Sequence, residues 1–136
     1  MSNPSKQKGT AFETQCVNYL KTWFPRIYRP ALQGGMDTGD INGVLQELEE
    51  TSPEGQYTWY RHLIFQCKNH KAFKLSEWMK ATKEQAANKA EGTLVEEAVG
   101  VLLVKRKGVG DQNMGKTYAI MELEDLVNLL LEAGYD

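Results

Sequence analysis

The sequence predicts one α/β domain in which a central mixed β-sheet is flanked by helices. Three observations lead to this fold class. The chain has 136 residues, about the length that one hydrophobic core usually organises. Its composition, 41% hydrophobic and 25% charged, is typical of globular proteins that bury a real core. Its hydrophobic patterns follow the order helix, strands, helix, strand, strand, helix, which is typical of a sheet with helices on its faces.

The individual elements follow from hydrophobic periodicity, turn residues and helix-end signals. Helices are expected over 10–24, 76–90 and 123–133, and strands over 26–32, 40–45, 57–68, 98–105 and 117–121. Thr10 and Glu13 have the T-x-x-E spacing of a capping box. Ser76 is a residue type that caps helices, and Gly134 is expected to end the last helix.

Between and before these elements, the sequence predicts surface segments. Residues 1–9 are polar and are expected to form a flexible N-terminus ahead of a single domain at 10–136. The acidic, proline-containing segment 47–56 is expected to be a surface connection, most simply a hairpin.

The cellular compartment and the thiol state follow from what the sequence lacks. No apolar run approaches the roughly 20 residues that cross a bilayer, and the N-terminus has no apolar stretch of a signal peptide. The expectation is therefore a cytoplasmic protein that makes no membrane contact. Cys16 and Cys67 lack the spacing of a zinc site, so two buried, reduced thiols are expected.

Charge is segregated along the chain although the formal net charge is only −2. Residues 61–90 contain seven basic and two acidic side chains, and residues 101–116 contain four basic and one acidic. Acidic residues gather instead in 47–54 and 122–136. This pattern predicts a face that binds a polyanion and an opposite face that repels it, with ordinary solvated charge as the alternative. The side chains expected to grip a nucleic-acid backbone are Arg29, Lys71, Lys74, Lys105, Arg106 and Lys107.

Three residues at the ends of two expected strands form a candidate metal site. Strand side chains alternate between faces, so Gln66 and Lys68 share a face while Cys67 points to the other. If the strands are neighbours, Asp40 approaches that face. Mg²⁺ takes one or two carboxylates and completes its shell with other oxygens and water. The expected ligands are Asp40, the Gln66 amide oxygen and the Cys67 backbone carbonyl, while Lys68 orients or deprotonates the attacking water and stabilises phosphoryl charge.

Asp40 followed by Gln66-x-Lys68, after a helix with Glu13, resembles the PD-(D/E)xK nuclease superfamily, with glutamine where most members have an acid. The stretches GTAFETQ, GGMDTGDINGV, FQCKNHKAFKLSEW and VLLVKRKGVGD are similar to small nucleases of actinobacterial phages regarded as Holliday junction resolvases, relatives of the archaeal resolvases. The resemblance implies a restriction-endonuclease-like core. It also implies that Glu13 is the helix glutamate, Asp40 the metal-binding aspartate, Gln66 the motif acid and Lys68 the motif lysine, with Glu13 as a further metal ligand. Segment 91–97 looks like extra length relative to that family.

The function implied by this resemblance is a structure-selective endodeoxyribonuclease that needs Mg²⁺, which Mn²⁺ can replace. Such enzymes cut four-way DNA as homodimers and leave 5′-phosphate and 3′-hydroxyl ends, a role in DNA recombination; a phage-encoded enzyme would work in the host cytoplasm. Leu129, Leu130 and Leu131 cover more than one helix face, which indicates burial against a partner subunit or within the fold. Two alternatives stay open: a catalytically weak or inert DNA-binding module, and a nuclease directed to flaps, nicks or mismatches.

Each candidate residue also has a purely structural interpretation. Glu13 can serve only as part of the capping box. Asp40 can be a turn aspartate, with Asp37 as its nearest competitor for the metal role. Lys68 can be a strand-end lysine that reaches solvent. Gln85 either touches the site from the second helix or lies at the edge of the core.

Overall fold

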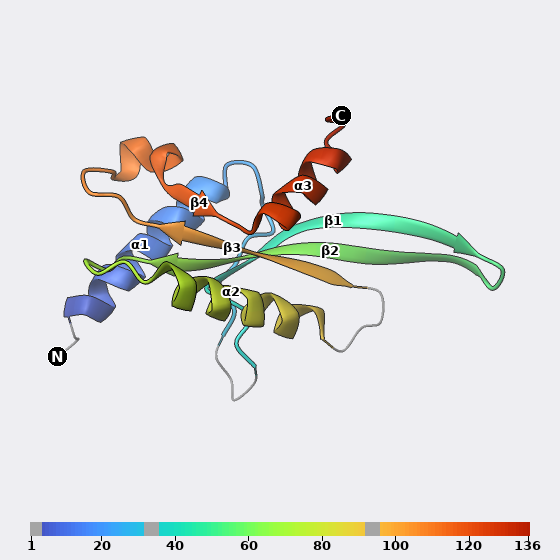
Figure 1. The fold of residues 1–136 in the computed structure, drawn as a ribbon, viewed down its shortest axis with the longest axis horizontal. Helices are drawn as coiled ribbons and strands as arrows, with labels where there is room; N and C mark the ends of the chain where they lie inside the picture. The colour runs from blue at the N-terminus through green and yellow to red at the C-terminus, as the bar shows by residue number, and fades with distance from the viewer. Residues whose placement is uncertain (1–3, 32–35, 92–95) are drawn as a thin grey trace.

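The computed structural model describes residues 4–31, 36–91 and 96–136. It confirms an α/β fold with a four-stranded mixed sheet flanked by helices (Figure 1). The elements in chain order are α1 (Pro4–Leu20), β1 (Ile41–Ser52), β2 (Gly55–Lys68), α2 (Leu75–Ala90), β3 (Glu97–Val104), the 3₁₀ helix η1 (Asp111–Lys116), β4 (Tyr118–Ile120) and α3 (Leu123–Glu132). Positions 92–95 of the extra segment lie outside the described residues.

The sheet has the strand order β1-β2-β3-β4. Strands β1 and β2 pair antiparallel, β2 and β3 parallel, and β3 and β4 antiparallel. The expectation that segment 47–56 is a connection is wrong in its extent, because both strands continue through it and only a tight turn joins them. Figure 1 shows this long hairpin extending away from the helices. The acidic residues fit a strand there because Leu48 and Trp59 face each other across the ladder while Glu47 and Glu49 stay exposed.

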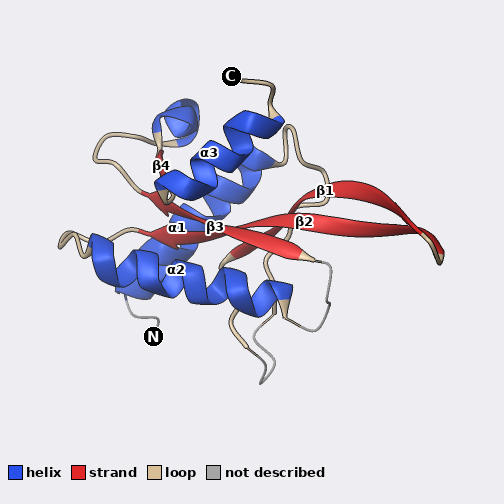
Figure 2. Ribbon diagram, turned by 45° about the vertical axis from the view of Figure 1, so that its right-hand side comes forward, coloured by secondary structure: helices blue, strands red, loops and turns tan. Residues whose placement is uncertain are grey.

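Helices cover both faces of the sheet, and each covered face has its own core (Figure 2). Alternation along β3 decides which residue joins which core. On the α1 face, buried apolar side chains from the helix, β1, β2, β3 and η1 pack together: Phe12, Cys16, Val17, Ile27, Ile41, Phe65, Val101, Leu103 and Met114. On the α2 face the buried cluster is Trp78, Leu102 and Val104. Cys67 packs against the α1 core beside Leu63, as its strand position predicts.

Helix α1 begins earlier than the sequence signals indicate. Residues 4–9, expected to be flexible, are its first turns, so Thr10 lies inside the helix. The capping box is therefore wrong: the Thr14 hydroxyl donates to the Thr10 carbonyl at 3.0 Å, as in a helix interior. Glu13 has no capping role and sits in mid-helix. The helix ends at Leu20, and a turn fills the remaining residues before Pro25.

Other boundaries agree or differ for local reasons. Of the expected strand at 26–32, the described residues 26–31 form only an isolated bridge, between Tyr28 and Asn42. Helix α2 has Lys74 at its N-cap with no side-chain cap bond, so Ser76 is not the cap. Helix α3 ends at the expected place, where Gly134 has φ of 93°. None of the helices among the described residues has the length and apolar character of a membrane span.

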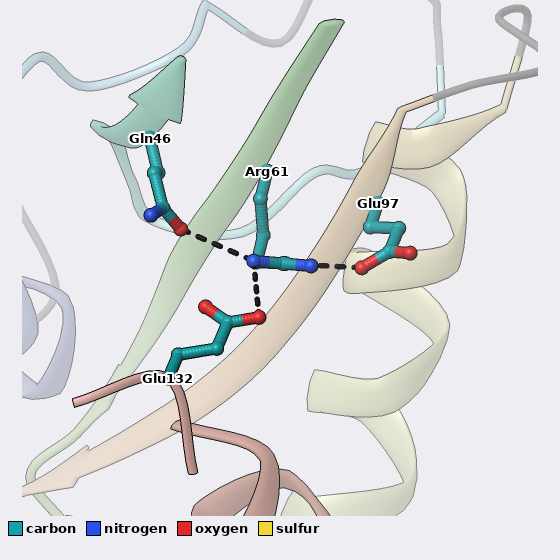
Figure 3. A network of polar contacts seen from close by, with 4 residues as sticks. All are labelled: Gln46, Arg61, Glu97 and Glu132. Atoms are coloured by element: carbon teal, nitrogen blue, oxygen red, sulfur yellow. Dashed lines mark hydrogen bonds and ion pairs between the residues drawn. The ribbon is translucent and has the colours of Figure 1, made fainter. Parts of the chain in front are cut away.

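Helix α3 is held largely by charged side chains. Arg61 on β2 donates to Gln46 at 3.1 Å and to Glu97 at 3.0 Å, and pairs with Glu132 of α3 (Figure 3). At the other end of α3, three carboxylates lie within 3.4 to 3.7 Å of Lys83 on α2, those of Glu122, Glu124 and Asp125. Two cations of the basic segment 61–90 are therefore neutralised within the fold, while no α3 residue is buried.

Candidate active site

Asp40 lies where β1 meets β2, as the sequence predicts. Strand β1 begins at the next residue and pairs antiparallel with β2. The Asp40 backbone N–H donates to the Phe65 carbonyl at 2.8 Å, and its carboxylate Oδ2 accepts from the Cys67 N–H at 2.7 Å. These two bonds join Asp40 to the residues on either side of Gln66. They fix the carboxylate against β2, the strand that contains Gln66 and Lys68. They use the amide of Cys67; coordination by its carbonyl stays a prediction.

The carboxylates of Glu13 and Asp40 both have raised pKa values, and in each a neighbouring carboxylate adds to the effect of burial: Asp40 for Glu13, and Asp37 for Asp40. Burial raises the pKa of Glu13, and the charge of Asp40 raises it further against the opposing effect of Arg29. Burial also raises the pKa of Asp40, although its bond from Cys67 and the charges of Lys68 and Arg29 lower it. The structure thus brings together Glu13, Asp40, Lys68 and Arg29 from four separate segments.

Arg29 lies close to α1 and to the two carboxylates, a placement that its sequence position does not show. Its guanidinium donates to the Thr10 carbonyl at 3.4 Å and to the Thr14 hydroxyl, which anchors the segment after α1 onto that helix. The same guanidinium acts on the pKa values of both Glu13 and Asp40. Arg29 therefore lowers the pKa values of both carboxyl groups, in addition to its predicted role of binding phosphate.

Cys67 and Gln66 point to opposite faces of the sheet, as alternation predicts. Cys67 faces Cys16 on α1: a hydrogen bond between the two thiols, together with burial, raises the pKa of Cys67 far above its ordinary value. Both cysteines are free thiols, as expected, but only Cys16 is fully buried, because Cys67 lies near the end of β2 and is partly exposed. Gln66 faces α2, where its amide contacts the hydroxyl of Thr82, and only 6% of its surface is exposed. Its amide oxygen is thus assigned to a contact on the side away from Glu13.

Asp37, the competitor of Asp40, is occupied by internal bonds. One carboxylate oxygen accepts from the Gly39 N–H at 2.9 Å and the other from Gln85 at 3.0 Å. Asn88 donates to its backbone carbonyl at 2.9 Å. Asp37 therefore fixes the turn before β1 onto α2, which leaves Asp40 as the better metal ligand. Gln85 is buried and reaches the site through Asp37, and its own amide oxygen has no hydrogen-bond partner.

Lys68 opens onto a basic surface that continues past the strand end. It lines a cavity of about 420 Å³ together with Lys71 and Lys74. That these two lysines bind a nucleic-acid backbone stays a prediction. A neighbouring cavity of about 640 Å³ shares His70 and Lys71 with the first. Its remaining lining includes Lys8, Lys105, Arg106 and Lys107. The basic segments after β2 and after β3, distant in sequence, therefore form one concave surface beside Lys68.

The two basic segments on this surface differ in how free their side chains are. Lys105 donates to the Val109 carbonyl and thereby closes the loop after β3. Arg106 donates to the Lys116 carbonyl at 3.0 Å and lies 4.4 Å from the centre of the Tyr118 ring. Lys71 has no ion pair among those of the described residues, and it is exposed. The segment after β3 thus also has a structural role.

The donor set fits a divalent cation only in part. Within the described ranges, no three His, Cys, Asp or Glu side chains lie together in a way that could hold a metal ion. Two carboxylates, Glu13 and Asp40, do have raised pKa values, with Asp40 within electrostatic range of Glu13, and Mg²⁺ usually takes no more than two from a protein. The other oxygens would come from Gln66, the Cys67 carbonyl and water.

Sequence reasoning missed two side chains that the structure places at or behind the site. Thr82 is fully buried against Gln66, and its signal was the buried helical row that it forms with Trp78, Gln85 and Ala86. The place of Arg29 beside the carboxylates depends on how the segment after α1 folds back, for which the sequence carries no local signal. Comparison with known proteins found no matching family model, curated protein or solved structure.

Proposed function

We propose that this chain is a metal-dependent DNA endonuclease with a restriction-endonuclease-like core, acting on branched DNA as a Holliday junction resolvase. The observation that carries the proposal is that Asp40 lies within electrostatic range of both Glu13 and Lys68, and that Lys68 lines a cavity together with Lys71 and Lys74. Burial raises the pKa of both carboxylates, a bound cation would offset that cost, and the adjacent lysines suit a phosphate backbone. The connection β2-α2-β3 with parallel strands also agrees with the resemblance.

The proposed reaction hydrolyses a phosphodiester and leaves 5′-phosphate and 3′-hydroxyl ends. Mg²⁺ or Mn²⁺, when bound, supplies Lewis-acid polarisation of the phosphate and a more acidic water. Asp40 and Glu13 hold the cation, with the Gln66 amide and the Cys67 carbonyl as neutral oxygens. Lys68 orients the attacking water and stabilises charge on the phosphoryl oxygens. Arg29 binds the phosphate on the α1 side, and Lys71, Lys74, Lys105, Arg106 and Lys107 bind the neighbouring backbone.

A homodimer is part of this proposal, because resolution of a four-way junction needs two symmetric cuts. Helix α3 is the element that offers a surface for a second copy, since its acidic side chains pair with residues of the fold while several of its apolar side chains are exposed. Leu123 is 73% exposed and Leu131 is 62% exposed. The oligomeric state measured by light scattering, for the wild type and for Leu131→Glu, tests whether α3 is that surface.

The proposal is tested by incubating the protein with duplex, flap, forked and four-way DNA, with Mg²⁺ or with chelator, and mapping the cuts. Symmetric cuts near the junction centre that need the metal are expected. Cuts confined to flaps, nicks or mismatches would show a nuclease that uses the same reaction on a different DNA structure. No cutting of any substrate with Mg²⁺ or Mn²⁺ would refute the enzyme.

A second candidate function is a DNA-binding module without catalysis. The observation that favours it is the environment of Gln66, which brings no charge and contacts Thr82 rather than the carboxylates. Titration calorimetry with Mg²⁺ and Mn²⁺ in the presence of uncut DNA separates the two functions. An enzyme is expected to bind the metal, whereas a module that has lost its metal site binds the DNA alone.

A further inference from the structure

The contact between Gln66 and Thr82 lacks a hydrogen-bond donor, because the single hydroxyl hydrogen of Thr82 is close to two acceptor oxygens. The Thr82 hydroxyl oxygen lies 2.5 Å from Gln66 Oε1 and 2.7 Å from the Trp78 carbonyl oxygen. A threonine hydroxyl has one hydrogen, and both neighbours are acceptors. Thr82 is 0% exposed, so bulk water does not supply the missing donor. One of the two contacts must therefore have a different donor.

The helix decides which contact keeps the hydroxyl proton. Trp78 lies four residues before Thr82, and buried threonine hydroxyls in helices donate to that carbonyl. The hydroxyl oxygen is then left as an acceptor toward Gln66. The amide of Gln66 supplies a donor if it turns by 180°, since its NH₂ group and its oxygen have nearly the same shape. In this arrangement Nε2 donates to Thr82, every group in the contact is satisfied, and Oε1 is released.

The released oxygen belongs to a residue that lies directly beside Asp40. The backbone N–H of Asp40 bonds to Phe65 and its carboxylate to Cys67, the two residues on either side of Gln66. We propose that Thr82 is a positioning residue: its hydroxyl holds the Gln66 NH₂ group so that the amide oxygen is free to coordinate the divalent cation held by Asp40. This inference rests on the proposed function and deepens it, because it explains how Gln66 can serve at the position where most members of the superfamily have an acidic residue.

The same geometry explains why a glutamine, and not a glutamate, suits position 66. A carboxylate has only acceptor oxygens, so it could bond to Thr82 only if the hydroxyl gave up the Trp78 carbonyl. A carboxylate would also add another negative charge beside Asp40, whose pKa is already raised. A neutral oxygen that is fixed by a hydroxyl avoids both costs. Gln66 and Thr82 are thus matched to each other.

The test compares Thr82→Val, which keeps the shape and removes the hydroxyl, with Thr82→Ser, which keeps the hydroxyl. Mg²⁺ binding to the full chain is measured by calorimetry with uncut DNA present, and cutting is measured against Mg²⁺ concentration. Loss of a group that orients a ligand typically weakens metal binding about 10-fold to 100-fold. We expect such a loss for Thr82→Val and less than about a twofold change for Thr82→Ser. Equal Mg²⁺ affinity of wild type and Thr82→Val would overturn the role of Thr82.

Two further measurements separate positioning from packing. In a Gln66→Met background, which has no amide oxygen, the effect of Thr82→Val on Mg²⁺ binding should disappear, because both residues act through one ligand. Additive losses would show that Thr82 only supports the fold. Thr82→Ala, a second variant without the hydroxyl, serves if the valine is not accommodated. A wild type that binds no Mg²⁺ at all refutes the proposed function itself, whereas normal wild-type binding with an unaffected Thr82→Val refutes only the positioning role.

Discussion

The two faces of strand β2 differ in the charge of the polar groups that lie beside them. On the α1 face, the carboxylates of Glu13 and Asp40 carry raised pKa values, and the partly buried thiol of Cys67 lies beside them. On the α2 face, Gln66 and Thr82 are neutral and contact each other in a packed layer. Perturbed carboxylates are expected where a protein binds a cation or performs chemistry. The comparison locates the proposed chemistry at the charged face and its support at the neutral one.

The largest expected effect comes from removing charge from the site. Asp40→Asn and Lys68→Ala should each lower the single-turnover rate of cutting about 100-fold or more, because each loses charge stabilisation in the transition state. Binding to uncut four-way DNA without metal should change little. The asparagine can still accept from the Cys67 N–H, so the strand junction is kept.

Matched controls remove the same charge elsewhere. Glu54→Gln lies in the exposed hairpin turn, and Lys21→Ala lies in the turn after α1, outside the lining of both basic cavities. Both controls should cut like the wild type. Near-normal cutting by Asp40→Asn or Lys68→Ala would show that the chemistry lies at another place on the molecule.

The neutral face is expected to resist added volume. A Cβ on Gly100 of β3 would lie 2.7 Å from the backbone oxygen of Thr82 and 2.8 Å from its Cγ2. Because backbone cannot move aside cheaply, Gly100→Ala should lower the free energy of unfolding by about 1–3 kcal/mol, the usual cost of overpacking. Urea unfolding followed by circular dichroism measures the change.

The control for this variant is Gly9→Ala in helix α1, where an added Cβ meets no atom within 4 Å. That substitution should leave stability unchanged or raise it slightly, since alanine favours helix. If Gly100→Ala proved as stable as the wild type, α2 would be free to shift over the sheet. The close support of Gln66 by Thr82 would then lose its basis.

Local patterns in the sequence were sufficient for the site residues that lie on strands. Alternation placed Gln66 and Cys67 on opposite faces, and the hydrophobic run after Asp40 located the start of β1. A sequence pattern gives a wrong prediction when it is compatible with two structures. The T-x-x-E spacing around Glu13 occurs at helix starts and also, here, in a helix interior. Contacts such as those of Arg29 and Thr82 depend on which elements pack together, so no single segment could predict them.

A third prediction concerns the pH dependence of stability on the charged face. Glu13 and Asp40 have raised pKa values in the fold, so they bind protons more tightly folded than unfolded. Their stabilising contribution is complete below the ordinary carboxyl pKa of about 4 and is lost as pH rises through the raised values. Asp40→Asn should therefore melt about 3 °C above the wild type at pH 7, with the difference vanishing toward pH 4.

Mg²⁺ provides the complementary measurement on the same pair of proteins. A cation that binds only the folded state raises the melting temperature in proportion to the logarithm of its concentration. The wild type should gain stability from millimolar Mg²⁺ at pH 7, and Asp40→Asn should gain little. Equal melting temperatures across pH 4 to 7 without metal would mean that Asp40 is not held in an unfavourable environment.

The smallest expected effects are on DNA binding by the basic surface beside the charged site. Lys71 lies between the two basic cavities and is exposed, so Lys71→Ala should weaken binding to four-way DNA about threefold to tenfold. It should also lower the slope of log affinity against log salt by about 0.9, the value for one phosphate contact.

Lys105→Ala removes a bond to the Val109 carbonyl, so part of its effect should be lost stability. Fluorescence anisotropy from about 50 to 200 mM salt, with Lys21→Ala as the control, measures the slopes. A slope unchanged in Lys71→Ala would place the DNA on a different face, away from Lys68 and the carboxylates.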